Sequence, residues 1–171
     1  MKKYTGSRDP RFVAIHRGGS LDPETHRLLA LWAADCAAHV LPLFHAQHPE
    51  DDRPRRAIVA VRAWARGEIT MMEAREAAYA AHAAARHASD STAKNAARAA
   101  GHAAATAHMA DHELGAAAYA IKAVRAANTE AVKAGIEERE WQREQLPEAI
   151  RNLVLSDQEL RNKKLWSLFK P

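Results

Sequence analysis

Apolar residues recur at every fourth position early in the chain, at Leu28, Trp32, Cys36, Val40 and Phe44. This spacing places them on one face of a helix. Asp22 and Pro23 precede the stripe and are typical of a helix N-cap followed by the first helical residue. The pattern therefore predicts a helix from residue 23, which we expect Pro42 to end or kink.

Capping signals predict further helices along the chain. Asp52 is the expected cap of a second helix, which Gly67 ends. Thr70 and Glu73 form a capping-box pattern for a third helix that runs to about Ala88. We expect a fourth helix to end near residue 109, and a fifth to begin near residue 111 and continue past residue 136.

The last part of the sequence adds two short patterns. Ile150 and Leu153 indicate a short helix, and Ser156 with Glu159 forms a second capping-box pattern before the apolar residues of 160–169. The sequence thus predicts an all-α fold of six or seven helices and no sheet. The final segment could cover the bundle or pair with a second copy, so a homodimer through the C-terminal helix stays open.

Alanine makes up 40 of the 171 residues, and 32 of these lie between Ala57 and Ala134. Alanine favours helices and is depleted in strands. Helices with so few large side chains cannot fill a wide core, but they can approach one another closely. We therefore expect a compact single-domain array with thin alanine-rich central helices. The similar strings AAYAAHA (77–83) and AAYAIKA (117–123) leave a HEAT-like repeat open.

The net charge of +4 is concentrated at the N-terminus. Residues 1–20 contain five lysines and arginines and one aspartate, while the rest of the chain sums to zero. A nucleic-acid-binding domain normally carries its basic residues across the folded body, so we do not expect nucleic acid as a partner. We expect residues 1–20 to be a flexible basic leader and residues 21–171 to form one all-α domain.

Several features favour a cytoplasmic protein. The charged N-terminal residues are not followed by the apolar region of a secretory signal, and no run of 18 apolar residues predicts a membrane span. Cys36 is the only cysteine, which excludes a disulfide framework and fits a reducing compartment. We therefore expect a cytoplasmic location and no association with a membrane.

Ten histidines are the main candidates for chemistry, and His82, His102 and His108 are surrounded by alanine. No bulky sequence neighbours cover these imidazoles, so they could face a shared polar pocket. His108 and His112 could chelate a metal only if one helix continued through Asp111, which is instead a cap signal. Because no complete metal or cofactor motif is present, we expect no metal and no cofactor.

Asp35 lies between Trp32 and His39 on the first predicted helix. A buried carboxylate needs a partner, so we expect Asp35 to be buried and to pair with a histidine or with an arginine of the alanine-rich helices. One interpretation is an ion pair that fixes the register of two helices. The other is a pocket that Asp35 shares with the three histidines.

Six segments, taken in order, carry a resemblance to a known family: WAADCAAHVLPLF (32–44), DDRPRRAI (51–58), RAWARGEI (62–69), EAREAAYAAHAAAR (73–86), AARAAGHAAATAH (96–108) and GAAAYAIKA (115–123). Over about residues 28–127 the chain resembles the alanine-rich bacterial immunity proteins of the family-five-like type. The resemblance implies an all-α protein that is encoded beside a polymorphic toxin and neutralises it by binding. It also implies candidate binding positions without an assigned role, namely Trp32, Asp35, Arg53, Trp64, His82, His102 and His108.

Two main functions follow from these observations, beside a third in which a DNA-associated helical protein acts through the basic residues of 1–20. The first is an interaction protein, not an enzyme, whose partner is the cognate toxin. Such a protein would bind through an exposed charged patch, for which the acidic clusters at 50–52 and 137–140 are candidates. The second is an enzyme or a small-ligand or metal-binding protein, in which Asp35 and the three histidines line one pocket.

Overall fold

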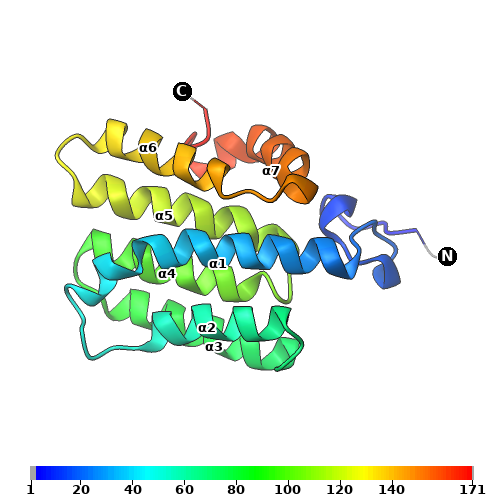
Figure 1. Ribbon diagram of the computed structural model, residues 1–171, viewed down its shortest axis with the longest axis horizontal. Coiled ribbons are helices and arrows are strands. Elements are labelled where there is room, and N and C mark those ends of the chain that lie inside the picture. The colour runs from blue at the N-terminus through cyan, green and yellow to red at the C-terminus, as the bar shows by residue number, and fades with distance from the viewer. Residues whose placement is uncertain (1–2, 171) are drawn as a thin grey trace.

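The computed structural model describes residues 3–170, which form seven α-helices, four short 3-10 helices and no β-strand (Figure 1). The α-helices are α1 (Pro23–His45), α2 (Arg53–Ala65), α3 (Met71–His87), α4 (Ser91–Ala105), α5 (Glu113–Ala127), α6 (Ala131–Glu144) and α7 (Glu148–Arg161). The 3-10 helices are η1 (Pro10–Phe12), η2 (Ile15–Arg17), η3 (Ala110–His112) and η4 (Asn162–Leu165). The predicted all-α array of six or seven helices is confirmed.

Local capping sets the starts of α1 and α3, as the sequence predicts. The side chain of Asp22 accepts a hydrogen bond from the Thr25 N–H at 2.9 Å. The Glu73 N–H donates to Thr70 Oγ1 at 3.2 Å, and the Thr70 N–H donates to Glu73 Oε2 at 2.7 Å. These bonds satisfy N–H groups that a first helical turn leaves without partners.

The predicted long fifth helix is wrong, and of the two outcomes expected at Pro42, an end or a kink, the end does not occur. α1 continues through Pro42 and ends at His45. Proline lacks an N–H group, but Val40 and Phe44 on either side of it are almost completely buried, and this burial stabilises the continuation. The expected long fifth helix is two helices, because residues 128–130 separate α5 from α6.

Polar side chains that bond to the backbone account for other boundary differences. Asn128 Nδ2 donates to the carbonyl of Val124 at 2.6 Å and satisfies a group in the last turn of α5. Ser156, a predicted helix start, lies inside α7, where its hydroxyl donates to the carbonyl of Leu153 at 3.0 Å. The same hydroxyl accepts a hydrogen bond from Arg11 Nη1 at 2.6 Å. It therefore links α7 to the N-terminal segment, residues 3–22, which precedes α1.

The alanine-rich helix α4 lies at the centre of the bundle. It packs against α1, α2, α3 and α5, and every buried residue on it is alanine or glycine. Side chains this small allow four helices to approach α4 closely. The prediction of thin alanine-rich central helices is therefore confirmed.

Large apolar side chains form a second core beside α1 and α5. Its members come from the N-terminal segment, α1, α5, α7 and the C-terminal segment, and include Phe12, Trp32, Leu114, Ile150 and Phe169. Each of these five side chains is 2% exposed or less. Burial of a side chain of this size contributes about 1.5–3 kcal/mol, so both ends of the chain are tied to one core.

The expectation of a flexible basic leader is wrong for the described residues of the segment. Phe12 and Val13 are each 2% exposed, and the following Leu21 is 4% exposed. The Leu21 N–H donates to the carbonyl of Val13 at 3.0 Å, which closes the segment on itself. The prediction rested on the count of positive charges and gave no weight to these apolar anchors. In Figure 1 the segment lies at one end of the bundle, beyond the start of α1.

The C-terminal segment covers the bundle. Leu168 and Phe169 are buried, and the Phe169 N–H donates to Asn162 Oδ1 at 2.9 Å. Arg143 Nη2 donates to the carbonyl of Phe169 at 2.8 Å. Leu168 and Phe169 are thus buried within the chain, whereas Leu160 and Trp166 are exposed, and the homodimer stays a prediction.

α1 is the one helix within residues 3–170 whose length and composition would allow it to cross a membrane. Its most apolar 18-residue window has a mean hydropathy of 1.4, and half of that window is buried in the bundle. Leu29, Ala33 and Cys36 have no exposed surface. The core helix of a globular protein has the same pattern.

Replacing Phe12 by alanine should destabilise the protein, because loss of a buried aromatic ring leaves a cavity. We expect the free energy of unfolding, measured by chemical denaturation, to fall by about 3–4 kcal/mol. Ile15→Ala is the matched control, since Ile15 is 40% exposed in the same segment, and it should cost less than about 1 kcal/mol. Small and equal losses would contradict packing of the segment on the bundle.

Candidate functional site

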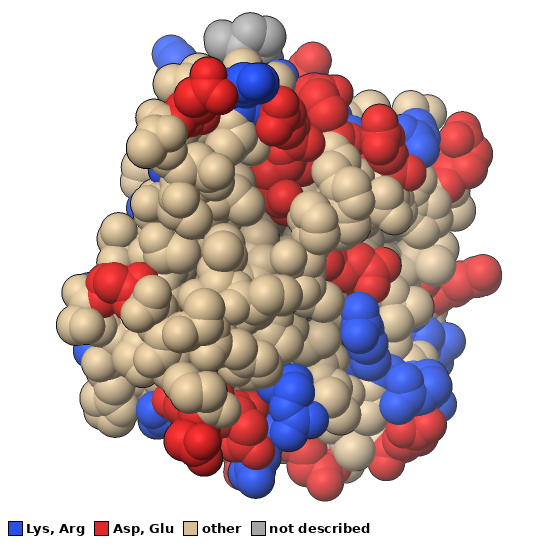
Figure 2. Space-filling model, turned by 60° about the vertical axis from the view of Figure 1, so that its left-hand side comes forward, with Lys and Arg blue, Asp and Glu red and all other residues tan. Residues whose placement is uncertain are grey.

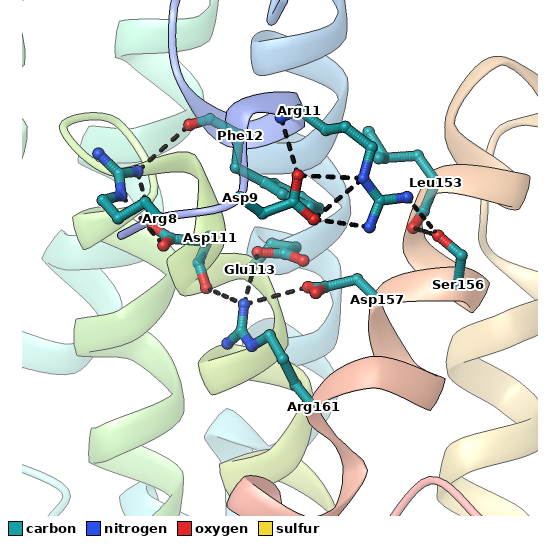
Figure 3. Close-up of polar contacts among 10 residues, drawn as sticks. All are labelled: Arg8, Asp9, Arg11, Phe12, Asp111, Glu113, Leu153, Ser156, Asp157 and Arg161. Carbon is teal, nitrogen blue, oxygen red and sulfur yellow. Dashed lines mark hydrogen bonds and ion pairs between the residues drawn. The ribbon is translucent and has the colours of Figure 1, made fainter. Parts of the chain in front are cut away.

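Charged contacts hold the N-terminal segment to the bundle (Figure 3). Arg8 Nη2 lies 2.9 Å from Asp111 Oδ1 in η3. Arg11 pairs with Asp9 at 2.7 Å and donates to Ser156 of α7 at 2.6 Å. The segment is therefore attached to η3 on one side and to α7 on the other.

A pair of buried carboxyl groups lies beside these contacts (Figure 3). Glu113 has no exposed surface, and neither of its carboxyl oxygens has a hydrogen-bond partner among residues 3–170. Burial, and next the negative charge of Asp157, raises the pKa of Glu113 well above its usual 4.5 and favours the neutral acid. Arg161 Nη1 lies 3.0 Å from Asp157 Oδ2 and 4.0 Å from Glu113 Oε2. One arginine therefore lies within ion-pair distance of both carboxyl groups.

A groove, called the N-terminal groove below, lies between the N-terminal segment and the nearby ends of α1 and α2. It consists of two adjoining cavities of about 460 and 260 Å³. Leu21, His26 and Trp64 line both cavities. Arg27 lines the larger cavity and Arg17 the smaller one, so the groove combines an aromatic wall with basic residues.

Two aromatic rings meet in this groove. His26 Nε2 donates to the carbonyl of Thr106 at 2.6 Å, and the ring centroids of His26 and Trp64 are 4.8 Å apart. Burial lowers the pKa of His26 below its usual 6.5. The ring is therefore neutral near pH 7 with its proton on Nε2, and it joins α1 to the residues that follow α4.

Four imidazoles form a row that leads from α3 to the groove. In order they are His82, His102, His112 and His108, and successive ring centroids are 5.2, 5.1 and 5.5 Å apart. Tyr119 of α5 stacks on His102 with the centroids 5.2 Å apart. His108 lines the smaller cavity, so this histidine row ends at the N-terminal groove.

Hydrogen bonds and burial keep the histidine row neutral. Arg98 Nη1 donates to His82 Nδ1 at 3.1 Å. His102 Nδ1 and His112 Nδ1 are 3.1 Å apart, a distance at which one ring donates its N–H to the other. Burial is the main cause that lowers the pKa of His102 to about 3 and the pKa values of His82 and His108 to about 4.

Two glycines make room for the rings. A Cβ atom on Gly115 of α5 would lie 2.4 Å from His102 Nδ1, and one on Gly101 of α4 would lie 2.5 Å from His82 Cε1. Atoms do not approach this closely, so only glycine lets each ring rest against the next helix. The rings therefore fill the space between α3, α4 and α5.

Within residues 3–170, no group of three or more His, Cys, Asp or Glu side chains is placed to hold a metal ion. His102 and His112 are in direct contact as a hydrogen-bonded pair. A structural zinc site needs four ligands arranged around the ion. The rings of the histidine row pack directly against one another in the described fold.

Four of the seven sequence-predicted site residues come together. His82 and His102 belong to the histidine row, and His108 and Trp64 line the cavity at its end. The link between His102 and His108 is His112, which the sequence analysis set aside because the helix breaks before it. The break is real, but η3 turns the ring of His112 toward the row.

The other three site residues lie elsewhere. Trp32 Nε1 donates to the carbonyl of Gln142 at 2.8 Å, which joins α1 to α6. Asp35 pairs with Arg62 at 2.8 Å, and its side chain is 49% exposed, so the expected ion pair is confirmed and the expected burial is wrong. Arg53 pairs with an aspartate of the loop between α1 and α2.

Sequence reasoning missed the residues that build the groove. His26 lies outside the apolar stripe of α1, and no spacing in the sequence singles it out. Arg17 was counted only as part of the leader charge. Both become visible only once the N-terminal segment is seen to fold back beside α1 and α2.

Nearby arginines balance the charge of the acidic cluster at 50–52, and burial removes one carboxyl group of the cluster at 137–140 from the surface. In the first cluster, Asp51 lies 2.6 Å from Arg53, and Asp52 lies 2.7 Å from Arg56. In the second, Glu138 is buried. Figure 2 shows the side of the molecule opposite the N-terminal segment, where residues of both charges surround an uncharged area. Neither cluster is a simple acidic face.

A family model described as "Imm-5 like putative immunity protein" matches residues 19–149 of the chain. The chain belongs to this family. This confirms the resemblance to family-five-like immunity proteins that the sequence motifs indicate. No curated protein and no solved structure matches the chain significantly. The matched residues of this Imm-5 like protein include α1 to α6, the complete histidine row and most of the groove wall.

In this Imm-5 like protein, Gly115→Ala should destabilise the fold, although glycine-to-alanine changes inside helices normally stabilise by about 0.5–1 kcal/mol. The added Cβ overlaps the ring of His102, and such overpacking costs about 1–3 kcal/mol. In a His102→Ala background, the same change should be stabilising. Denaturation of all four proteins measures this coupling, and additive effects would contradict the proposed ring packing.

The histidine row also predicts a loss of stability in acid. His102 has a pKa of about 3 in the folded protein against the usual 6.5, so below pH 6.5 the unfolded chain binds a proton that the folded chain excludes. Stability from this group is present above pH 6.5 and is lost as the pH falls toward 3. The decrease in the free energy of unfolding between pH 6.5 and pH 5 should be about 1–2 kcal/mol smaller for His102→Gln than for wild type.

The difference between His102→Gln and wild type isolates the contribution of His102 to the pH dependence of stability. Glu113, whose pKa is raised by burial, contributes in the opposite direction, because its stability is lost as the pH rises. It is present in both proteins, and its contribution therefore cancels in the difference. Parallel stability curves for His102→Gln and wild type would show that the ring is not held neutral.

Proposed function

We propose that this protein neutralises a toxin by binding to it directly in the cytoplasm. The observation that carries the proposal is membership of the immunity protein family over residues 19–149. Direct binding can block a toxin without any chemical step, provided that shape and charge are complementary. The toxin would come from a polymorphic toxin system and would be encoded beside this protein, as the family resemblance implies.

The geometry supports a binding role. The rings of the histidine row rest against each other and against glycine backbone. The ion pair of Arg8 with Asp111 and the hydrogen bond from Arg11 to Ser156 hold the N-terminal segment in place. A surface that is ordered before it meets its partner loses less conformational entropy on binding. This protein therefore offers a preformed surface rather than a flexible tail.

The alternative function, an enzyme or a small-ligand or metal-binding protein, depends on Asp35 and three histidines in one pocket. Asp35 faces Arg62 instead of a histidine. The partly buried, uncharged rings of His82 and His102 are already hydrogen-bonded within the fold. What supports this alternative is the N-terminal groove, which the row reaches at His108.

Toxin inhibition should reach completion at one molecule of this protein per toxin. Co-expression with the toxin encoded beside it should restore the growth of a bacterial host. Calorimetry with the catalytically inactivated toxin should give a one-to-one complex. A protein that modified the toxin chemically would act at far lower ratios, so inhibition at one molecule per hundred toxins, without a stable complex, would refute neutralisation by binding.

A further inference from the structure

Free basic residues distinguish the N-terminal groove from the rest of the charged surface. Arg17 and Arg27 are exposed and line the groove. Neither forms an ion pair within residues 3–170, whereas the arginines at the start of α2 are paired with aspartates. The aspartate of the larger cavity, Asp22, uses its carboxylate to cap α1 through Thr25. Two unpaired arginines and one aspartate therefore leave the groove with a net positive charge.

The groove also has an apolar wall of suitable size. Ile15, Leu21 and Trp64 line the larger cavity of about 460 Å³, which is within the usual range of ligand-binding pockets. Ile15 is 40% exposed although it lies beside this cavity. Tryptophan and arginine are the residue types that most often dominate the energy of protein interfaces. The groove offers both, side by side.

The outer wall of the groove is the side formed by the N-terminal segment. This wall is held in place before any partner binds. Arg8 fixes it to Asp111 at 2.9 Å, and Arg11 fixes it to Ser156 at 2.6 Å. Phe12 anchors it in the second core. Little ordering is therefore needed on binding, which favours affinity.

We propose that the N-terminal groove receives the toxin, through an acidic segment that places an aromatic side chain against Trp64 and carboxylates against Arg17 and Arg27. The inference rests on the proposed function, since it names the toxin as occupant. Arginine pairs with carboxylates through two parallel hydrogen bonds. The net positive charge of the groove selects an acidic partner, and the apolar wall selects a segment that also carries a large side chain.

Charge reversal in the groove should slow the capture of the toxin. The association rate constant of the inactivated toxin with the Arg17→Glu/Arg27→Glu variant, measured by stopped flow at low salt, should be at least about tenfold below that of wild type. The difference should shrink at high salt. An unchanged rate, with wild type binding normally, would overturn the groove assignment and leave neutralisation by binding intact.

A matched control has the same change in net charge at another place. Arg86 and Lys94 are exposed near the end of α3 and the start of α4, at the opposite end of the bundle from the N-terminal segment (Figure 1). The Arg86→Glu/Lys94→Glu variant should keep the wild-type rate. An equal loss in both double variants would show a general charge effect and would also overturn the proposal.

A peptide probe tests the groove without the toxin. The acidic peptide Glu-Asp-Phe-Asp-Glu, titrated into ¹⁵N-labelled full-length protein, should shift the indole N–H resonance of Trp64, assigned with Trp64→Phe. The basic peptide Lys-Arg-Phe-Arg-Lys should not shift it. If the toxin fails to bind wild type but the acidic peptide gives this response, the proposed function fails while the groove's preference for acidic segments stands. No response, or an equal response to sodium phosphate alone, would overturn the preference for an acidic, aromatic segment.

Discussion

The close approach of four helices to α4 is the constraint on which the structure depends. It is possible because the buried residues of α4 are alanine and glycine. Such residues bury little apolar area each, so this part of the core contributes less per residue than a core of large side chains. The second core compensates, since it gathers large residues such as Trp32 and Phe169 around α1 and α5. This requirement draws both terminal segments of the chain onto the bundle.

The same close packing explains the state of the histidines. Where α4 and α5 carry Gly101 and Gly115, the space beside the backbone is filled by the rings of His82 and His102. Rings held in this way lose contact with water, and the neutral form is favoured because a buried charge without a partner is costly. The histidine row is thus first a packing device. The row ends at His108, which forms part of the groove wall.

Local sequence signals predicted the helices well, because capping and periodicity depend on neighbours within one or two turns. The caps at Asp22 and at Thr70 are examples. The errors arose where contacts distant in sequence decide the outcome. Pro42 stays helical because the core buries the residues around it, and Ser156 is held by Arg11, which is 145 positions away in the sequence.

The candidate site was predictable to a similar extent. Alanine-rich surroundings group His82, His102 and His108 in the sequence, and the structure places the three rings in one row through His112. The exposure of Asp35 was not predictable, because a residue beside a buried stripe can face either the core or a neighbouring helix. The groove was invisible in the sequence, since its outer wall depends on the contact between Arg8 and Asp111, 103 positions apart.

The two walls of the groove differ in whether they lie within the region that matches the family model. Residues 19–149, which match the family model, supply Trp64, His26 and His108 of the inner wall. Arg8 and Arg17 of the outer wall lie before the matched region. Recognition often depends on segments that a rigid scaffold positions, and here the bundle is the scaffold while the charged anchors hold the segment. Because Arg17 lies in the outer wall and outside α4 and its neighbours, a change at this position would alter the charge of the groove without disturbing the packing of the bundle.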